Sequence, residues 1–382
     1  MDGDVYGGTS GIGWFLAHLS AATRDDDVAA TARAGLRQGL ARVGEATADG
    51  FYTGRAGIAL AAVTAGRALG DAEIVSEGAD LALAARDARR EAAVAEVDVI
   101  AGAAGTILAL LQLGRALEDS AFRAAAVSVG EALLSRANRD ADGWSWPAAA
   151  ASEPFLCGLG HGASGIALAL LELEAASGDA RFGEGARGAL LYERTWFSRE
   201  HGNWPDLREL DQARIEAGAA PAYLVYWCHG AAGIGLVRLR AHERGAGASA
   251  TAEAGAAIDV ATATMLRLVG AGRDPVPVDV TLCHGAGAVA ELHVCAAETT
   301  GDREHLATAR RLYRWALWGK DASEPGRLPR ELPCGVPGGS ETPGLMLGLA
   351  GIGALLLRLH DPAAIPSPLL PVAWAGGTGR VS

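Results

Sequence analysis

Residues 229–239 read HGAAGIGLVRL, a glycine-rich turn that runs directly into an apolar segment. Six further stretches of the chain repeat this pattern, and they begin at Gly7, Thr53, Ala101, His161, His284 and Leu347. The leading glycines of the seven turns follow one another at intervals of about 46 to 68 residues. A period of this length accommodates two helices in each repeat.

The segments that follow and separate these turns predict two kinds of helix. Each turn opens a nearly unbroken apolar run, such as residues 166–173, which is typical of a helix buried on most sides. The stretches 29–43, 122–137 and 303–317 instead space their apolar residues three and four apart, with arginine and glutamate on the other face. Helices of this second kind are amphipathic and are expected to lie outside.

Seven buried helices that alternate with half-exposed ones pack economically as two concentric rings. We therefore predict an all-α fold, an α/α toroid with seven inner helices entered by glycine-rich turns. A linear helical solenoid explains the period equally well. It would expose one face of every inner helix, however, and these helices are too apolar for that. The repeat shows no obvious linker, so we expect one domain over residues 1–382, with an insertion at about 194–221.

The composition narrows the class of function. The formal net charge is −12 and no basic cluster is interleaved with aromatic residues, which argues against a nucleic-acid partner. No apolar run is long enough to span a bilayer, and the N-terminus MDGDVYGG does not resemble a signal peptide. We therefore expect a soluble, cytoplasmic protein without a membrane span. Its five cysteines, an odd number, favour metal ligation or a reactive thiol over a disulfide framework.

A Cys-His-Gly triplet occurs twice at equivalent places in the repeat, at Cys228 and at Cys283. Thiolates and imidazoles are preferred ligands of zinc, and a site with three protein ligands leaves the fourth tetrahedral position open. Two cysteines and a histidine would make such a site. Free cysteines are also commonly buried as small apolar residues, which is the reading we favour for Cys157, Cys295 and Cys334.

His161 occupies the repeat position that matches His229 and His284, so we expect the three imidazoles at one end of the toroid. A lone histidine is usually structural, but three in register point to a shared site. Asp98 lies four residues before Gly102 and therefore at the same rim, one repeat earlier. Its carboxylate either caps a helix or orients His161 and balances its charge.

These turns resemble the lanthionine synthetase C-like family, the zinc-dependent cyclases of lanthipeptide biosynthesis. The resemblance covers nearly the whole chain and is carried by WCHG at 227–230, CHG at 283–285, GHGASGI at 160–166 and LMLGLAGIG at 345–353. It implies an α/α toroid with seven inner helices. It also implies that Cys228, Cys283 and His284 bind Zn²⁺. His161 would be the acid/base histidine and Asp98 its acidic companion.

The chain departs from one branch of this family at two places. That branch has arginine where this chain has Leu224 and tyrosine where it has His229, so the roles of that arginine and tyrosine are not transferred. With a histidine at this place, the chain is more similar to the cyclase domains of bifunctional and multidomain synthetases, or to the eukaryotic-like relatives. No amphipathic helix precedes the first turn. The tail at 363–382 supplies the missing outer helix, the ring is completed differently, or the chain is a module of a longer synthetase.

The resemblance implies a lanthionine synthetase cyclase that forms carbon–sulfur bonds. A cysteine thiol of a dehydrated precursor peptide would add to a dehydroalanine or dehydrobutyrine of the same peptide and close a thioether ring. Zinc would deprotonate the thiol. We expect His161 to donate a proton to the resulting enolate, with His229 as the second candidate and Asp98 holding the donor. A dehydratase or other synthetase domains are the expected further partners.

Two alternatives remain open on the sequence. In the first, a separate thiol such as glutathione is added to dehydroamino acids, with the same zinc chemistry. In the second, the protein is a non-catalytic, zinc-containing scaffold that binds a peptide in a biosynthetic complex. A fourth protein ligand, from Cys157 or His229, would favour the scaffold because it would leave no room for a substrate thiol.

Overall fold

The computed structural model describes residues 1–46, 48–88, 96–147, 155–208, 214, 217–270, 278–319, 332–335 and 341–373. The regular secondary structure of these residues is almost entirely helical. Among them, one short hairpin pairs β1 (Asn138–Asp140) antiparallel with β2 (Gly143–Ser145). A single 3-10 turn, η1 (Val43–Glu45), follows the second helix.

Seven inner helices begin at the seven glycine-rich turns. They are α1 (Thr9–Thr23), α3 (Arg55–Ala68), α5 (Ala103–Leu117), α7 (Ala163–Ser177), α10 (Ala231–Glu243), α12 (Ala286–Thr300) and α14 (Leu349–His360). The leading glycine of each turn is the N-cap residue of its helix. Most side chains of these helices are buried, as the unbroken apolar runs predicted. The repeat therefore marks the starts of the inner helices.

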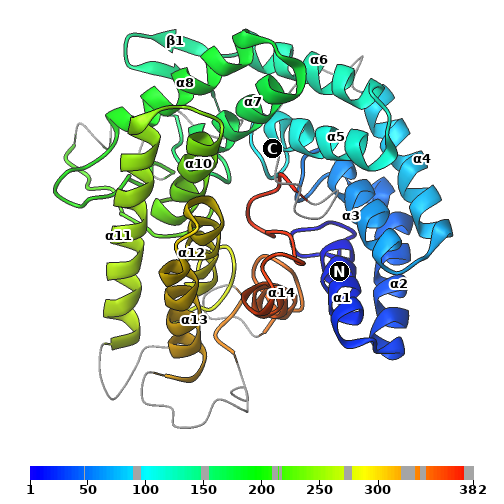
Figure 1. The fold of residues 1–382 in the computed structure, drawn as a ribbon. Helices are drawn as coiled ribbons and strands as arrows, with labels where there is room; N and C mark the ends of the chain where they lie inside the picture. The colour runs from blue at the N-terminus through cyan, green and yellow to red at the C-terminus, as the bar shows by residue number, and fades with distance from the viewer. Residues whose placement is uncertain are drawn as a thin grey trace.

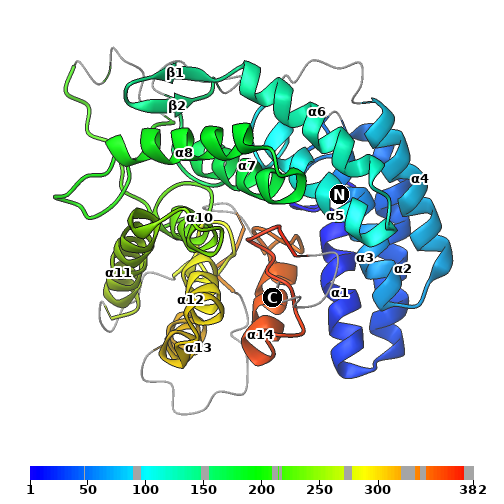
Figure 2. The ribbon, with the colours of Figure 1, turned by 45° about the horizontal axis from the view of Figure 1, so that its top comes forward.

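The outer layer consists of helices that follow the inner ones along the chain. They are α2 (Asp26–Ala41), α4 (Ala72–Ala88), α6 (Ala121–Ser135), α8 (Ala180–Thr195), α11 (Ala248–Gly270) and α13 (Arg303–Trp318). Each packs against the inner helix that precedes it, so that paired helices surround a common centre (Figures 1 and 2). The three stretches predicted to be amphipathic and outside are α2, α6 and α13.

Neighbouring inner helices contact one another in chain order, and α14 also contacts α1, which closes the ring (Figure 1). A circuit of backbone hydrogen bonds links the seven turns as well. It comprises Tyr6 N to Tyr52 O (2.9 Å), Tyr52 N to Ile100 O (3.0 Å), Val99 N to Gly160 O (3.2 Å), Gly160 N to Cys228 O (3.2 Å), Trp227 N to Cys283 O (2.8 Å), Cys283 N to Met346 O (3.0 Å) and Met346 N to Tyr6 O (2.9 Å). The α/α toroid is thus confirmed, and a linear solenoid is excluded.

The segment after α14 lies inside the ring (Figure 1). The Tyr52 hydroxyl donates a hydrogen bond to Pro368 O (2.8 Å), and the Trp227 indole donates one to Leu369 O (2.9 Å). Within the described residues, which end at 373, the tail forms no outer helix. Of the three alternatives for completing the ring, an outer helix from the tail is excluded for residues 363–373, where backbone carbonyls accept hydrogen bonds from inner side chains instead. Residues 374–382 lie outside the described part of the chain.

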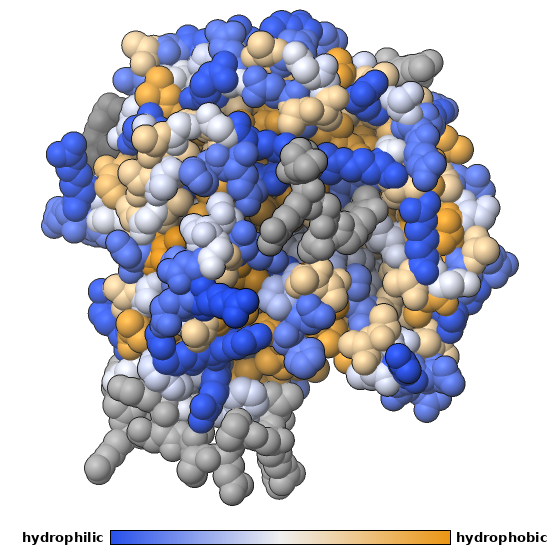
Figure 3. Space-filling view, in the orientation of Figure 1, coloured by the Kyte–Doolittle hydropathy of each residue, from blue (hydrophilic) through white to orange (hydrophobic). Residues whose placement is uncertain are grey.

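Polar and apolar residues are distributed as this architecture requires. On the face shown in Figure 3, hydrophilic residues predominate on the outer parts of the molecule and hydrophobic ones appear in the hollows. Of the helices that the structure describes, none is long and apolar enough to cross a membrane. A fully buried ion pair between Arg238 of α10 and Glu193 of α8 (2.9 Å) fixes one part of the rim, because Glu193 also accepts a hydrogen bond from the Gly158 amide (2.7 Å).

Candidate metal and acid–base site

The fifth and sixth turns bring three potential metal ligands together. Cys228 lies two residues before the N-cap of α10, and Cys283 and His284 directly precede the N-cap of α12. Their sulfur and ring nitrogen atoms all lie within 4.8 Å of one another. Both cysteines are buried and His284 is half-buried. Helix N-termini carry positive partial charge, which favours thiolates at this position.

Two glycines allow these turns to approach closely. Gly230 has φ +107°, and a Cβ atom there would lie 1.9 Å from the carbonyl oxygen of Leu224. A Cβ atom on Gly160 would lie 2.9 Å from the Cβ atom of Cys228. The turn that carries His161 can therefore pack directly against the turn that carries Cys228.

The two cysteine side chains interact strongly. A hydrogen bond from Cys283 lowers the pKa of Cys228 to about 4, against the opposing effect of burial and with help from His284. Burial and the charge of Cys228 raise the pKa of Cys283 well above its ordinary value. One of the two thiols thus ionises readily. Two sulfurs and one imidazole at this spacing are a donor set that zinc prefers, so the residues fit a zinc ion.

His161 lies beside this cluster and is held by Asp98. Its Nδ1 atom is 2.6 Å from Asp98 Oδ2. The other carboxylate oxygen accepts hydrogen bonds from the amides of Ala101 (2.8 Å) and Gly102 (2.9 Å). Burial alone would lower the pKa of His161, but the hydrogen bond and charge of Asp98 raise it above its ordinary value. One oxygen of Asp98 thus orients His161, and the other holds the turn that leads into α5, although Asp98 does not cap the helix because Gly102 is its N-cap residue.

His229 stacks on His161, with the ring centroids 5.6 Å apart. The side chain is 1% exposed, and its Nε2 atom has no hydrogen-bond partner in the described structure. Its Nδ1 atom is 4.0 Å from Asp206 Oδ1. A buried polar atom without a partner is rare, so this nitrogen retains unused hydrogen-bonding capacity beside His161.

Four residues near the cluster were missed by sequence reasoning. The Tyr6 hydroxyl donates a hydrogen bond to Cys283 Sγ (3.2 Å), and the ring of Tyr226 lies 5.0 Å from that of His284. Asp206 lies beside His229, and Asp206 in turn pairs with Arg208. Asp206 and Arg208 lie outside the repeated turns, so the repeat carries no signal for them, whereas Tyr6 stands two residues before Gly8, as Cys228 stands two residues before Gly230.

The family comparison agrees with this geometry. The family model described as "Lanthionine synthetase C-like protein" matches residues 1–370. The chain belongs to this family. Among solved structures, this lanthionine synthetase C-like protein is similar to one named "Nisin cyclase", with 14% sequence identity and a TM-score of 0.66. The match covers 97% of this chain and 91% of the other, and it shows a shared fold. No curated protein matches the sequence.

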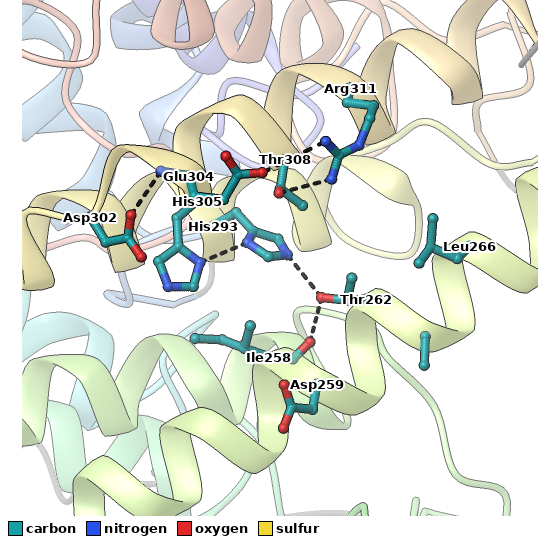
Figure 4. A pocket seen from close by; sticks show the side chains of 11 residues that line it. Ile258, Asp259, Thr262, Leu266, His293, Asp302, Glu304, His305, Thr308 and Arg311 are labelled. Atoms are coloured by element: carbon teal, nitrogen blue, oxygen red, sulfur yellow. Dashed lines mark hydrogen bonds and ion pairs between the residues drawn. The ribbon is translucent and has the colours of Figure 1, made fainter.

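This lanthionine synthetase C-like protein has a second group of histidines between α11, α12 and α13 (Figure 4). They line a cavity of about 380 Å³. The Nδ1 atoms of His293 and His305 are 3.1 Å apart, and His293 Nε2 is 2.9 Å from the Thr262 hydroxyl. Thr262 donates its proton to Ile258 O (2.6 Å), so it must accept from His293. This outer pocket therefore holds a continuous hydrogen-bonded chain across three helices.

Proposed function

We propose that the protein is a zinc-dependent lanthipeptide cyclase. It would join a cysteine thiol of a dehydrated precursor peptide to a dehydroalanine or dehydrobutyrine of the same peptide. The observation that carries this proposal is the convergence of Cys228, Cys283 and His284 beside the Asp98–His161 pair. A thiol-activating site and a proton donor are the two parts that the reaction requires.

The three ligand residues would hold zinc and leave one coordination position for the substrate. When bound, the ion would lower the pKa of a substrate thiol, which at its ordinary value of about 8.5 is mostly protonated at neutral pH. Cys228 and Cys283 lie in backbone hydrogen bonds on neighbouring turns, so their positions are set before the substrate arrives. Tyr6, in the turn before α1, also holds Cys283 in position, because its hydroxyl donates a hydrogen bond to the Cys283 sulfur.

The addition forms a bond between sulfur and the β-carbon of the dehydroamino acid. The π electrons move to the carbonyl oxygen and give an enolate, which must then take a proton at its α-carbon. We assign this proton to His161. Asp98 occupies His161 Nδ1, which leaves Nε2 for the substrate, and its hydrogen bond and charge raise the pKa of His161, which favours the protonated ring. His229 is the second candidate because its Nε2 is unpartnered.

Two alternatives use the same residues differently. Addition of a separate thiol such as glutathione would use the same bond-forming chemistry as cyclisation. The two reactions differ only in whether the thiol belongs to the dehydrated peptide or to a second molecule. A scaffold with a closed metal site is less well supported, because the ligand group in the described structure has three members and includes neither Cys157 nor His229. Cys157 packs instead with Leu156 and Leu207 in a small apolar cluster.

We also propose that the ring is a single domain and acts in the cytoplasm. The insertion packs on the ring through Trp204, which is fully buried. All five cysteines are free thiols, as expected in a reducing compartment. A dehydratase or other synthetase domain would supply the dehydrated peptide.

The test measures zinc content and then follows a dehydrated peptide by thiol alkylation and mass spectrometry, with and without glutathione. Ring closure consumes the thiol and leaves the peptide mass unchanged. Addition of glutathione raises the mass by that of glutathione and would favour the first alternative. A zinc-loaded protein that leaves the thiols of the dehydrated peptides unreacted in both conditions would refute the enzyme proposal.

A further inference from the structure

The insertion between α8 and α10 is anchored on the ring just beside the candidate site. Trp204 is fully buried and its ring lies 4.7 Å from that of Phe197. The side-chain amide of Asn203 donates a hydrogen bond to Leu224 O (2.9 Å), and the backbone amide of Asp206 donates one to Ala222 O (2.8 Å). The stretch from 203 to 206 is therefore held in place against the strand of chain that leads to Cys228.

Asp206 holds the guanidinium of Arg208 at the rim. Arg208 Nε is 3.0 Å from Asp206 Oδ1, and Nη2 is 2.6 Å from Oδ2. The Nη1 atom makes no hydrogen bond within the described structure, and the side chain is 43% exposed. Asp206 also lies 4.0 Å from His229, whose ring stacks on His161. Arg208, Asp206, His229 and His161 thus form a continuous row along the site.

The charge of Arg208 interacts with the ionisable groups of this site. Its hydrogen bond with Asp206 raises its pKa, and the charges of Cys228 and Cys283 raise it further. The same guanidinium acts against protonation of His161 and His229. It therefore lies within electrostatic range of the metal ligands and of both candidate proton donors, on a side chain that still reaches solvent.

We propose that Arg208 is a further catalytic residue that binds the carbonyl oxygen of the dehydroamino acid during addition. The inference rests on the proposed cyclase function. As sulfur bonds to the β-carbon, negative charge develops on that oxygen, and it disappears when His161 protonates the α-carbon and the carbonyl re-forms. A fixed, always charged, planar donor stabilises such an oxyanion more than it stabilises the neutral ground state.

The insertion brings the positive charge of Arg208 to a rim where the neighbouring chain supplies none. Leu224 lies on the chain that leads to Cys228 and brings no charge to the site. Asp206 neutralises part of the arginine charge, but it also fixes the orientation of the guanidinium through Nε and Nη2, so that among the described residues Nη1 has no partner and can bind the substrate. A preorganised donor of this kind requires no rearrangement during the reaction.

The test compares Arg208→Ala, Arg208→Lys and the matched control Arg199→Ala, an exposed arginine of the same insertion. Zinc content, KM and kcat are measured on a dehydrated peptide. We expect Arg208→Ala to lower kcat by about 10²–10³-fold, the usual effect of removing an oxyanion donor, with zinc content and KM little changed. Arg208→Lys should recover only part of the loss, because a point charge lacks the planar fork. Arg199→Ala should match the wild type.

Each other result overturns a specific statement. A kcat of Arg208→Ala within about twofold of Arg199→Ala would overturn the role of Arg208 and leave the cyclase proposal intact. Loss of zinc in Arg208→Ala would assign the residue to assembly of the metal site and also overturn its catalytic role. A zinc-loaded wild-type protein that closes no ring would refute the cyclase function itself, and the inference would fail with it.

Discussion

The rim site and the outer pocket contain the same kinds of side chain, yet they differ in how those side chains are satisfied. In the outer pocket, each hydrogen bond of His293 ends on Thr262 or His305, and the chain terminates on a helix carbonyl. At the rim, His229 keeps a buried nitrogen without a partner in the described structure, and His161 is bonded at Nδ1 alone. Burial lowers the pKa of both His293 and His229 to about 4, so burial does not separate them.

The difference shows what distinguishes a candidate reactive site. Side chains from several repeats meet there and keep unused hydrogen-bonding or ligating atoms, whereas residue type and cavity size do not separate the two regions. The outer pocket holds two histidines, but both ring nitrogens of the buried His293 are satisfied, and its hydrogen bonds tie α11, α12 and α13 together (Figure 4). The rim residues come from separate repeats, and His229 there keeps a buried ring nitrogen without a partner in the described structure. Variants of the two regions should therefore have opposite effects on activity and on stability.

The largest expected effect comes from Cys283→Ala. Removing one of two thiolates leaves two ligands, so zinc content should fall from about one per chain to near zero, and ring closure should be lost with it. Inductively coupled plasma mass spectrometry and the peptide assay measure both. The control is Cys334→Ala, a cysteine outside the cluster. Full zinc occupancy in Cys283→Ala would show that the rim cluster is not the metal site.

His161→Asn is expected to lower kcat by about 10²–10⁴-fold while zinc is retained, because the variant removes a proton donor and no ligand. His305→Asn in the outer pocket is its matched control and should leave kcat unchanged. Steady-state kinetics with zinc-loaded protein measure the contrast. Equal losses in the two variants would contradict the distinction between the regions.

Asp98→Asn should move the pH dependence of kcat. Asp98 raises the pKa of His161, so protonated His161 persists to higher pH in the wild type. Without that charge, burial prevails and the pKa falls, so the basic limb of the profile should shift to lower pH. The amide oxygen can still accept from Ala101 and Gly102, which preserves the turn. Rates between about pH 5.5 and 9 test this, and an unmoved basic limb would remove Asp98 from this role.

The smallest effect on activity is expected from Thr262→Val. This change leaves the buried His293 Nε2–H without an acceptor and should lower the free energy of unfolding by about 1–3 kcal/mol. Urea unfolding measures the loss, and kcat and zinc content should match the wild type. Thr264→Val, at a half-buried position of the same helix, is the control for the substitution itself, because the Thr264 hydroxyl accepts a hydrogen bond from the exposed Arg267 rather than from a buried histidine. A fall in kcat at unchanged zinc content would link the outer pocket to catalysis.

The repeat made the fold and the clustering of the candidate metal ligands predictable. Leading glycines such as Gly230 and Gly285 are the N-caps of inner helices, so residues just before them had to meet at one rim. Asp98 was ambiguous because a carboxylate near a helix start can cap the helix or orient a neighbour; in the structure one oxygen contacts His161 and the other holds the turn before α5. Arg208 could not be predicted, and Tyr6 was overlooked although it stands two residues before Gly8, as Cys228 stands before Gly230. Tyr6 reaches Cys283 across 277 positions of sequence, and Arg208 belongs to a stretch with no counterpart in other repeats.

The backbone circuit through the seven turns would spread the effect of metal binding at the rim to the other turns. Cys283 contributes both its amide and its carbonyl to that circuit, and Cys228 contributes its carbonyl. A loop of links without a free end cannot relax at one point alone, so immobilising the two cysteines should slow solvent exchange of the amides of Tyr52 and Met346 as well. Slower exchange at Tyr52 and Met346 would then indicate that the metal site is occupied, although neither residue is a candidate ligand.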